Sequence, residues 1–101
     1  MKLKEFFDVE ICKNHIRLSF AKDNAGALPY VTTTANNNGV ECYVDYPAQY
    51  TGGKITVSKD GDSADAFVQF VPFCGNEKVM VLTPKKELTD KELLFYSLLI
   101  N

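Results

Sequence analysis

Short strand-like segments, separated by turn-forming residues, occupy most of this chain. The clearest are Val40–Tyr46, Lys54–Ser58 and Ala66–Val71, each bordered on at least one side by glycine or proline. Val40–Tyr46 alternates between apolar and polar positions, which is the period of a strand with one buried face. Because glycine, proline and asparagine favour turns, this pattern predicts a domain made mainly of short strands.

Two further alternating runs lie near the N-terminus. In Phe7–Ile11 the apolar positions are Phe7, Val9 and Ile11, and we expect a strand with these three side chains facing the core. The run His15–Phe20 alternates in the same way. Only a short turn-like link separates the two runs, so they are predicted to form a hairpin. A polar loop and another extended segment are expected to come next in the chain.

The C-terminal part predicts one buried strand and one helix. Lys78–Leu82 has apolar residues on both of its faces, which is typical of a strand covered on both sides. Thr89 and Glu92 have the spacing of a capping box and predict the helix start. The helix Leu93–Ile100 is apolar nearly all round, so it is either buried or docked on a partner. The expected partner interface consists of Leu94, Phe95 and Leu98.

Together these elements predict one α+β domain over residues 1–101: a twisted, mostly antiparallel β-sheet of short strands with one C-terminal helix. Hydrophobic residues make up 46% of the chain, which is ordinary for a globular protein. No apolar run approaches the roughly 20 residues that a membrane span needs. The first residues do not resemble a signal peptide. We therefore expect a cytoplasmic protein.

The charge balance limits the mode of DNA binding. The chain has 11 basic and 13 acidic residues, for a net charge of −2. A domain that binds nucleic acid by neutralising phosphates alone is normally basic. Strong non-specific binding by this chain alone is therefore not expected, whereas a local basic patch remains open.

No common catalytic motif is present, so we expect neither an enzyme nor a cofactor. Cys12 and His15 form an isolated C-x-x-H, which is half of a zinc site at most, and thiol catalysis by this pair is a weaker alternative. The remaining cysteines, Cys42 and Cys74, are expected to be free thiols. Lys59–Asp65 resembles the start of a calcium loop, but an acidic β-turn is the favoured interpretation.

The segment Thr32–Gly39 is the most unusual in composition, since seven of its eight residues are small and polar or glycine. Asparagine can pair bidentately with adenine in the major groove, and threonine can contact bases or phosphates. The same residues also make a good hairpin turn, which composition alone favours. Both interpretations remain open at this point.

A family resemblance rests on this segment and on several motifs nearer the C-terminus. Leu28–Val40, with the sequence LPYVTTTANNNGV, resembles a motif of the target-recognition domains of type I restriction–modification specificity subunits and of fused restriction–methylation enzymes. Further matches occur in the family's order, at Gly53–Gly61, Ala66–Gln69, Pro72–Phe73, Val79–Lys85 and Leu93–Ile100. The chain lacks the later strands and the spacer helix of the family, which predicts a shortened form or a fragment.

The resemblance implies a DNA-recognition module that reads one half of a bipartite target and works with a methyltransferase or restriction subunit. Its expected partner is double-stranded DNA, bound weakly by this chain alone. The implied DNA-binding residues are Thr33, Asn36, Asn37, Asn38, Lys54, Ser58 and Lys59. The alternative is a protein-interaction or dimerisation module that uses the apolar C-terminal helix, as in a homodimer, without DNA binding of its own.

Overall fold

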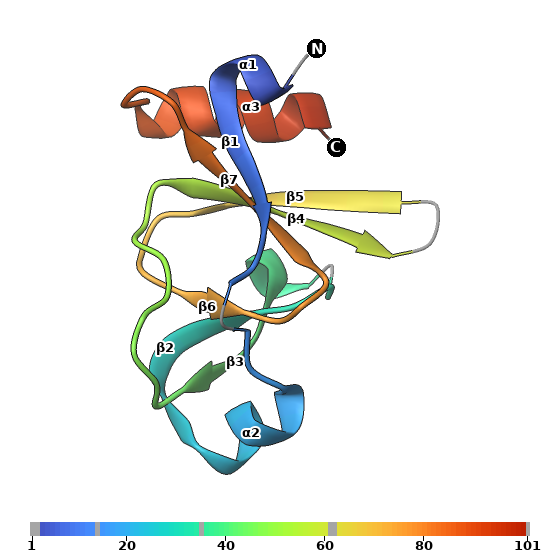
Figure 1. The fold of residues 1–101 in the computed structure, drawn as a ribbon, viewed down its shortest axis with the longest axis vertical. Helices are drawn as coiled ribbons and strands as arrows, with labels where there is room; N and C mark the ends of the chain where they lie inside the picture. The colour runs from blue at the N-terminus through green and yellow to red at the C-terminus, as the bar shows by residue number, and fades with distance from the viewer. Residues whose placement is uncertain (1–2, 14, 35, 61–62, 101) are drawn as a thin grey trace.

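The fold was obtained as a computed structural model that describes residues 3–13, 15–34, 36–60 and 63–100, with residues 3, 59, 60, 63 and 64 described in their backbone only (Figure 1). Two short helices, a 3₁₀ turn, seven strands and a C-terminal helix are described. In chain order they are α1 (Leu3–Phe6), β1 (Phe7–Ile11), α2 (Leu18–Asp23), β2 (Ala25–Val31), η1 (Asn37–Gly39), β3 (Val40–Val44), β4 (Lys54–Asp60), β5 (Ser63–Gln69), β6 (Cys74–Gly75), β7 (Val79–Pro84) and α3 (Asp90–Ile100).

The strands form two sheets. The larger sheet has the order β1-β7-β4-β5 and is antiparallel throughout, and the smaller has the order β3-β2-β6, with β2 and β6 parallel. Helix α3 lies on the far side of the larger sheet from the smaller sheet and α2 (Figure 1). The predicted α+β class, with mostly antiparallel strands and a C-terminal helix, is confirmed. The division into two sheets was not predicted.

Helix α3 begins as the sequence indicated. The backbone N–H of Thr89 donates to Glu92 Oε1 at 3.1 Å, and the N–H of Glu92 donates to Thr89 Oγ1 at 3.2 Å. These reciprocal bonds form a capping box, and the hydrogen bonds from Thr89 lower the pKa of the Glu92 carboxyl. The helix packs Leu93 into a core cluster of the larger sheet with Phe7, Ile55 and other residues.

A second core cluster joins the two sheets. It contains Val31 and Val40 from the smaller sheet and Val79 and Val81 from β7. Phe73 is fully buried in the same cluster. Val79 and Val81 belong to this cluster and Leu82 to the α3 side, so β7 is buried on both faces, as its sequence predicted. The two sheets are thus held in a fixed arrangement by a shared apolar interior.

The predicted N-terminal hairpin is wrong. Strand β1 pairs with β7, which is far away in sequence, and Leu18–Asp23 is a helix. Ile16 and Ala21 are both buried in a third cluster beneath the smaller sheet. Five positions apart, they would lie on opposite faces of one continuous strand, and both can face inward because the chain leaves the extended conformation between them, where α2 begins at Leu18. Ile11, expected in the core, is 63% exposed at the end of β1.

Candidate nucleic-acid interface

The asparagine-rich segment forms a tight turn between β2 and β3. We call residues 36–39 the asparagine turn. Asn37, Asn38 and Gly39 have φ angles of 50°, 58° and 79°, so all three lie in the left-handed region. Asparagine and glycine tolerate this region best, which explains their place here. The N–H of Thr32 donates to the carbonyl of Gly39 at 2.9 Å and closes the base of the loop. The predicted turn is confirmed.

Hydrogen bonds fix the asparagine turn to the larger sheet. Asn38 donates from Nδ2 to the carbonyl of Val68 at 2.9 Å, and Gln69 donates from Nε2 to the carbonyl of Asn38 at 2.9 Å. The same Gln69 nitrogen also lies 3.1 Å from Thr56 Oγ1, and Gln69 is only 3% exposed. These bonds link the turn to both β4 and β5. The turn therefore has a defined position relative to the sheet, as a recognition element requires.

Asn36 and Asn37 are the members of the turn whose amides are available. Both residues are exposed. Asn37 donates from Nδ2 to the carbonyl of Val40 over a long 3.4 Å, and the side chain of Asn36 makes no hydrogen bond with the described residues. Thr33, in the same loop, is half-buried. The turn thus presents donor and acceptor groups to solvent while Asn38 holds it in place.

Three basic or hydroxyl residues of β4 were also predicted to contact DNA. Lys54 lies opposite Gln69 in the β4–β5 register, close to the residue that binds the asparagine turn, and it donates to Thr51 Oγ1 at 2.8 Å. Ser58 is 5% exposed and its hydroxyl faces the carbonyl of Asp65 at 3.5 Å, so it is a buried side chain of the hairpin. The side chain of Lys59 lies outside the described residues.

Gln69 positions the asparagine turn, and the sequence reasoning missed it. It is the only amide side chain in the otherwise apolar run Ala66–Val71. An isolated polar residue in a buried strand must find hydrogen-bond partners, and here it finds the asparagine turn. That exception to the apolar pattern was the signal available in the sequence.

The geometry does not support a catalytic or metal-binding site at Cys12 and His15. His15 forms a pair with Glu77, with Nε2 and Oε2 3.4 Å apart, and Cys12 is buried. Burial raises the pKa of the Cys12 thiol and raises that of Cys74 to about 12, which disfavours reactive thiolates. Among the described side chains, no group of three or more His, Cys, Asp or Glu residues could hold a metal ion. The tip of the proposed calcium loop lies outside the described residues.

Comparison with known proteins identifies the family. Residues 1–101 match the family model of the type I restriction modification DNA specificity domain. The chain belongs to this family. It is therefore a DNA-recognition module of a restriction–modification system, as its motifs predicted.

A similar curated protein is the "Type II restriction enzyme BgcI specificity subunit S.BcgI" of Heyndrickxia coagulans, which is 30% identical over 101 residues. The alignment covers 98% of this chain but 29% of that protein, so the chain spans less than a third of its relative's length. No solved structure gives a significant match. Among the described helices, none is long and apolar enough to cross a membrane.

Proposed function

We propose that this specificity domain reads bases of double-stranded DNA through the asparagine turn. The observation that carries the proposal is that Asn36 and Asn37 are exposed while Asn38 holds the turn on β5. Side-chain amides can donate to and accept from one base edge at once, most specifically at adenine. A fixed turn loses little conformational entropy when it binds, so its few polar contacts can discriminate between bases.

Residues around the turn complete the proposed contact surface. Thr33 in the same loop supplies a hydroxyl, and Lys54 on β4 supplies positive charge for backbone phosphates. Lys59, whose side chain lies outside the described residues, stays a predicted phosphate contact from the sequence. Ser58 supports the hairpin from inside, because its side chain is buried. With a net charge of −2, the chain offers few phosphate contacts, so its affinity for DNA alone is expected to be weak.

In this proposal residues 1–101 form one recognition domain of a longer specificity subunit. That subunit works in the cytoplasm with a methyltransferase or restriction subunit that performs the chemistry, and this domain has no catalytic role. The low coverage of the S.BcgI relative supports the idea that further domains share the task. One such domain would read one half of a bipartite target.

A second candidate function is protein interaction through α3. The outward face of this helix leaves Leu94, Phe95 and Leu98 exposed by 47%, 58% and 72%. Several large apolar side chains gathered on one exposed helix face are typical of an interaction surface. In the first proposal this face docks on the partner subunit. In the second, it forms a homodimer and the chain binds no DNA of its own.

Selection from a pool of random-sequence duplexes tests the proposed function. The full protein that carries this domain, in its native complex, is mixed with the pool and the bound duplexes are sequenced. We expect enrichment of one short motif that requires residues 1–101, because the domain supplies one half of the target. Binding without any enriched motif, or no binding to the pool, would contradict base reading and favour the interaction module.

A further inference from the structure

A hollow of about 260 Å³ opens beside Thr33, in the loop that leads into the asparagine turn. Its polar lining consists of Arg17, Thr33, Asn76, Glu77 and Lys78. These residues come from three separate parts of the sequence, and the sequence pattern did not associate them. The fold therefore brings two cations to one flank of the predicted base-reading turn.

Hydrogen bonds from side chains and from the backbone hold the three segments around this hollow. Tyr30 is fully buried and its hydroxyl donates to the carbonyl of Ile16 at 2.7 Å, next to Arg17. The N–H of Asn76 donates to the carbonyl of Val31 at 3.1 Å, and the N–H of Lys78 donates to Asn76 Oδ1 at 3.0 Å. The positions from which both cationic side chains start are thus fixed relative to the turn.

The charges in the hollow favour an anion. Arg17 and Lys78 are both exposed, and neither forms an ion pair with the side chains that the structure describes. The carboxylate of Glu77 is turned toward His15, with which it forms the 3.4 Å pair. The lining of the hollow therefore carries two cations and one carboxylate, which gives it a net positive charge. The hydroxyl of Thr33 and the amide nitrogen of Asn76 add neutral donors.

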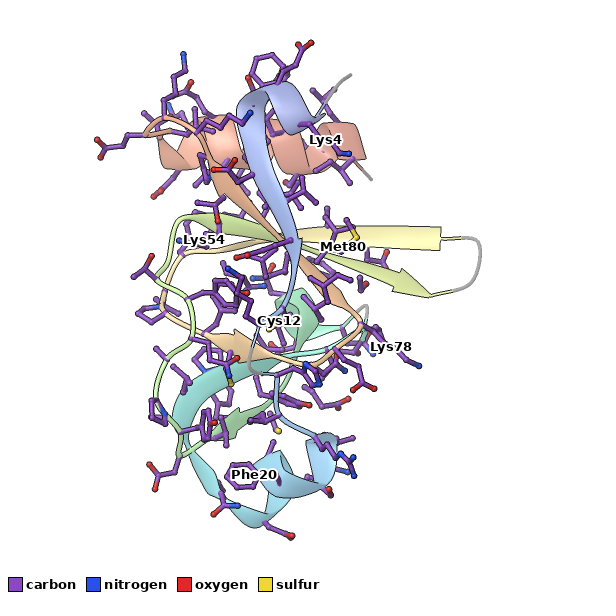
Figure 2. All side chains as sticks on the ribbon, viewed as in Figure 1. Lys4, Cys12, Phe20, Lys54, Lys78 and Met80 are labelled. Carbon is purple, nitrogen blue, oxygen red and sulfur yellow. The ribbon has the colours of Figure 1, made fainter. Side chains whose placement is uncertain are left out.

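We propose that Arg17 and Lys78 each bind a phosphate of the DNA backbone on the flank of the asparagine turn. This inference rests on the proposed function, in which that turn meets base edges. Phosphate contacts fix the register of a protein on the duplex, while base contacts specify sequence. Lys54 and Lys78 lie toward opposite edges of the molecule in Figure 2. Cations on both edges would bind DNA phosphates on either side of the asparagine turn, which would then lie over the bases.

The salt dependence of DNA binding tests this assignment. The double variant Arg17→Gln/Lys78→Gln, in the full protein and its native complex, is titrated with a 30-bp random-sequence duplex between 50 and 200 mM salt. Each phosphate contact contributes about −0.9 to the slope of log K against log salt, so two lost contacts reduce its magnitude by about 1.8. The wild type should therefore lose roughly tenfold more affinity than the variant over this range.

A matched pair of cations provides the control. Lys4 and Lys86 are also exposed, and Lys4 lies beside α3, away from Lys78 (Figure 2). The variant Lys4→Gln/Lys86→Gln should keep the wild-type slope. Arg17 makes no side-chain cap bond to α2, so its replacement should leave the melting temperature unchanged. The charge-preserving single variant Arg17→Lys should keep most of the wild-type salt slope.

The outcomes separate this inference from the proposed function. A reduced slope with an unchanged selected motif supports the phosphate contacts. A wild-type slope in the Arg17→Gln/Lys78→Gln variant overturns the phosphate contacts. The proposed base reading by the asparagine turn still holds in that case if Asn37 variants lose sequence preference. An equal reduction in the Lys4→Gln/Lys86→Gln control also overturns the phosphate contacts, because the effect would then depend on overall charge. If the wild type binds no DNA, both proposals are wrong.

Discussion

Replacing Asn37 by glycine is expected to weaken binding to the selected DNA motif by about 5- to 150-fold, which corresponds to the roughly 1–3 kcal/mol of one bidentate base contact. Glycine removes the amide but keeps the positive φ of 50° accessible. The loss should be confined to one base pair of the motif. Competition binding with duplexes altered at single positions measures it, and random-sequence DNA should bind the variant as well as the wild type.

Two related variants sharpen this result. Asn37→Ala should lose the same sequence preference and about 1 kcal/mol of folding free energy as well, because alanine disfavours the left-handed region. Asn38→Ala should mainly reduce the free energy of unfolding, because the Asn38 amide donates a 2.9 Å hydrogen bond to the carbonyl of Val68. If Asn37→Gly binds the selected motif and its mutated versions like the wild type, Asn37 is not a base-reading residue.

Replacing Gly39 by alanine is expected to reduce the free energy of unfolding by about 2–5 kcal/mol. The left-handed backbone at φ 79° costs an alanine about 1–2 kcal/mol. An added Cβ would also lie 3.0 Å from Cδ2 of Phe67, so the ring must shift, and such crowding costs about 1–3 kcal/mol. Urea denaturation followed by circular dichroism measures the loss.

Gly53 provides a matched control for this change. Its φ of 82° is similar, but a Cβ there would meet nothing within 4 Å. Gly53→Ala should therefore lose only the backbone part, about 1–2 kcal/mol. Equal losses at the two glycines would show that the Phe67 ring accommodates the added Cβ and that only the backbone conformation of Gly39 matters for stability.

The sequence predicted the elements whose signals are local. The capping box of Thr89 and Glu92, the asparagine turn and the alternation of β3 each depend on residues a few positions apart. The prediction of an N-terminal hairpin was wrong because the strand pairing of this segment is not local. Strand β1 finds its partner β7 about seventy residues along the chain, and the burial of Ile16 and Ala21 overrides the alternating pattern that suggested a strand.

The candidate site likewise has a part that the sequence predicts and a part that depends on contacts between distant segments. The turn and its exposed asparagines could be read from residues 36–39 alone. Which asparagine anchors the turn depends on Val68 and Gln69 of another strand, and the flank formed by Arg17 and Lys78 depends on the packing of three segments. Ser58 was predicted to bind DNA but its side chain is buried, because one strand alone does not indicate which of its faces the rest of the fold covers.

Site-specific photo-cross-linking tests most directly whether the asparagine turn meets DNA. Benzoylphenylalanine is introduced at Asn36, or at Phe95 on the exposed face of α3, in the full protein bound to its selected duplex. The proposed geometry predicts cross-links to bases from position 36 and none from position 95. Cross-links from position 95 alone, or none from position 36 while the duplex stays bound, would contradict it.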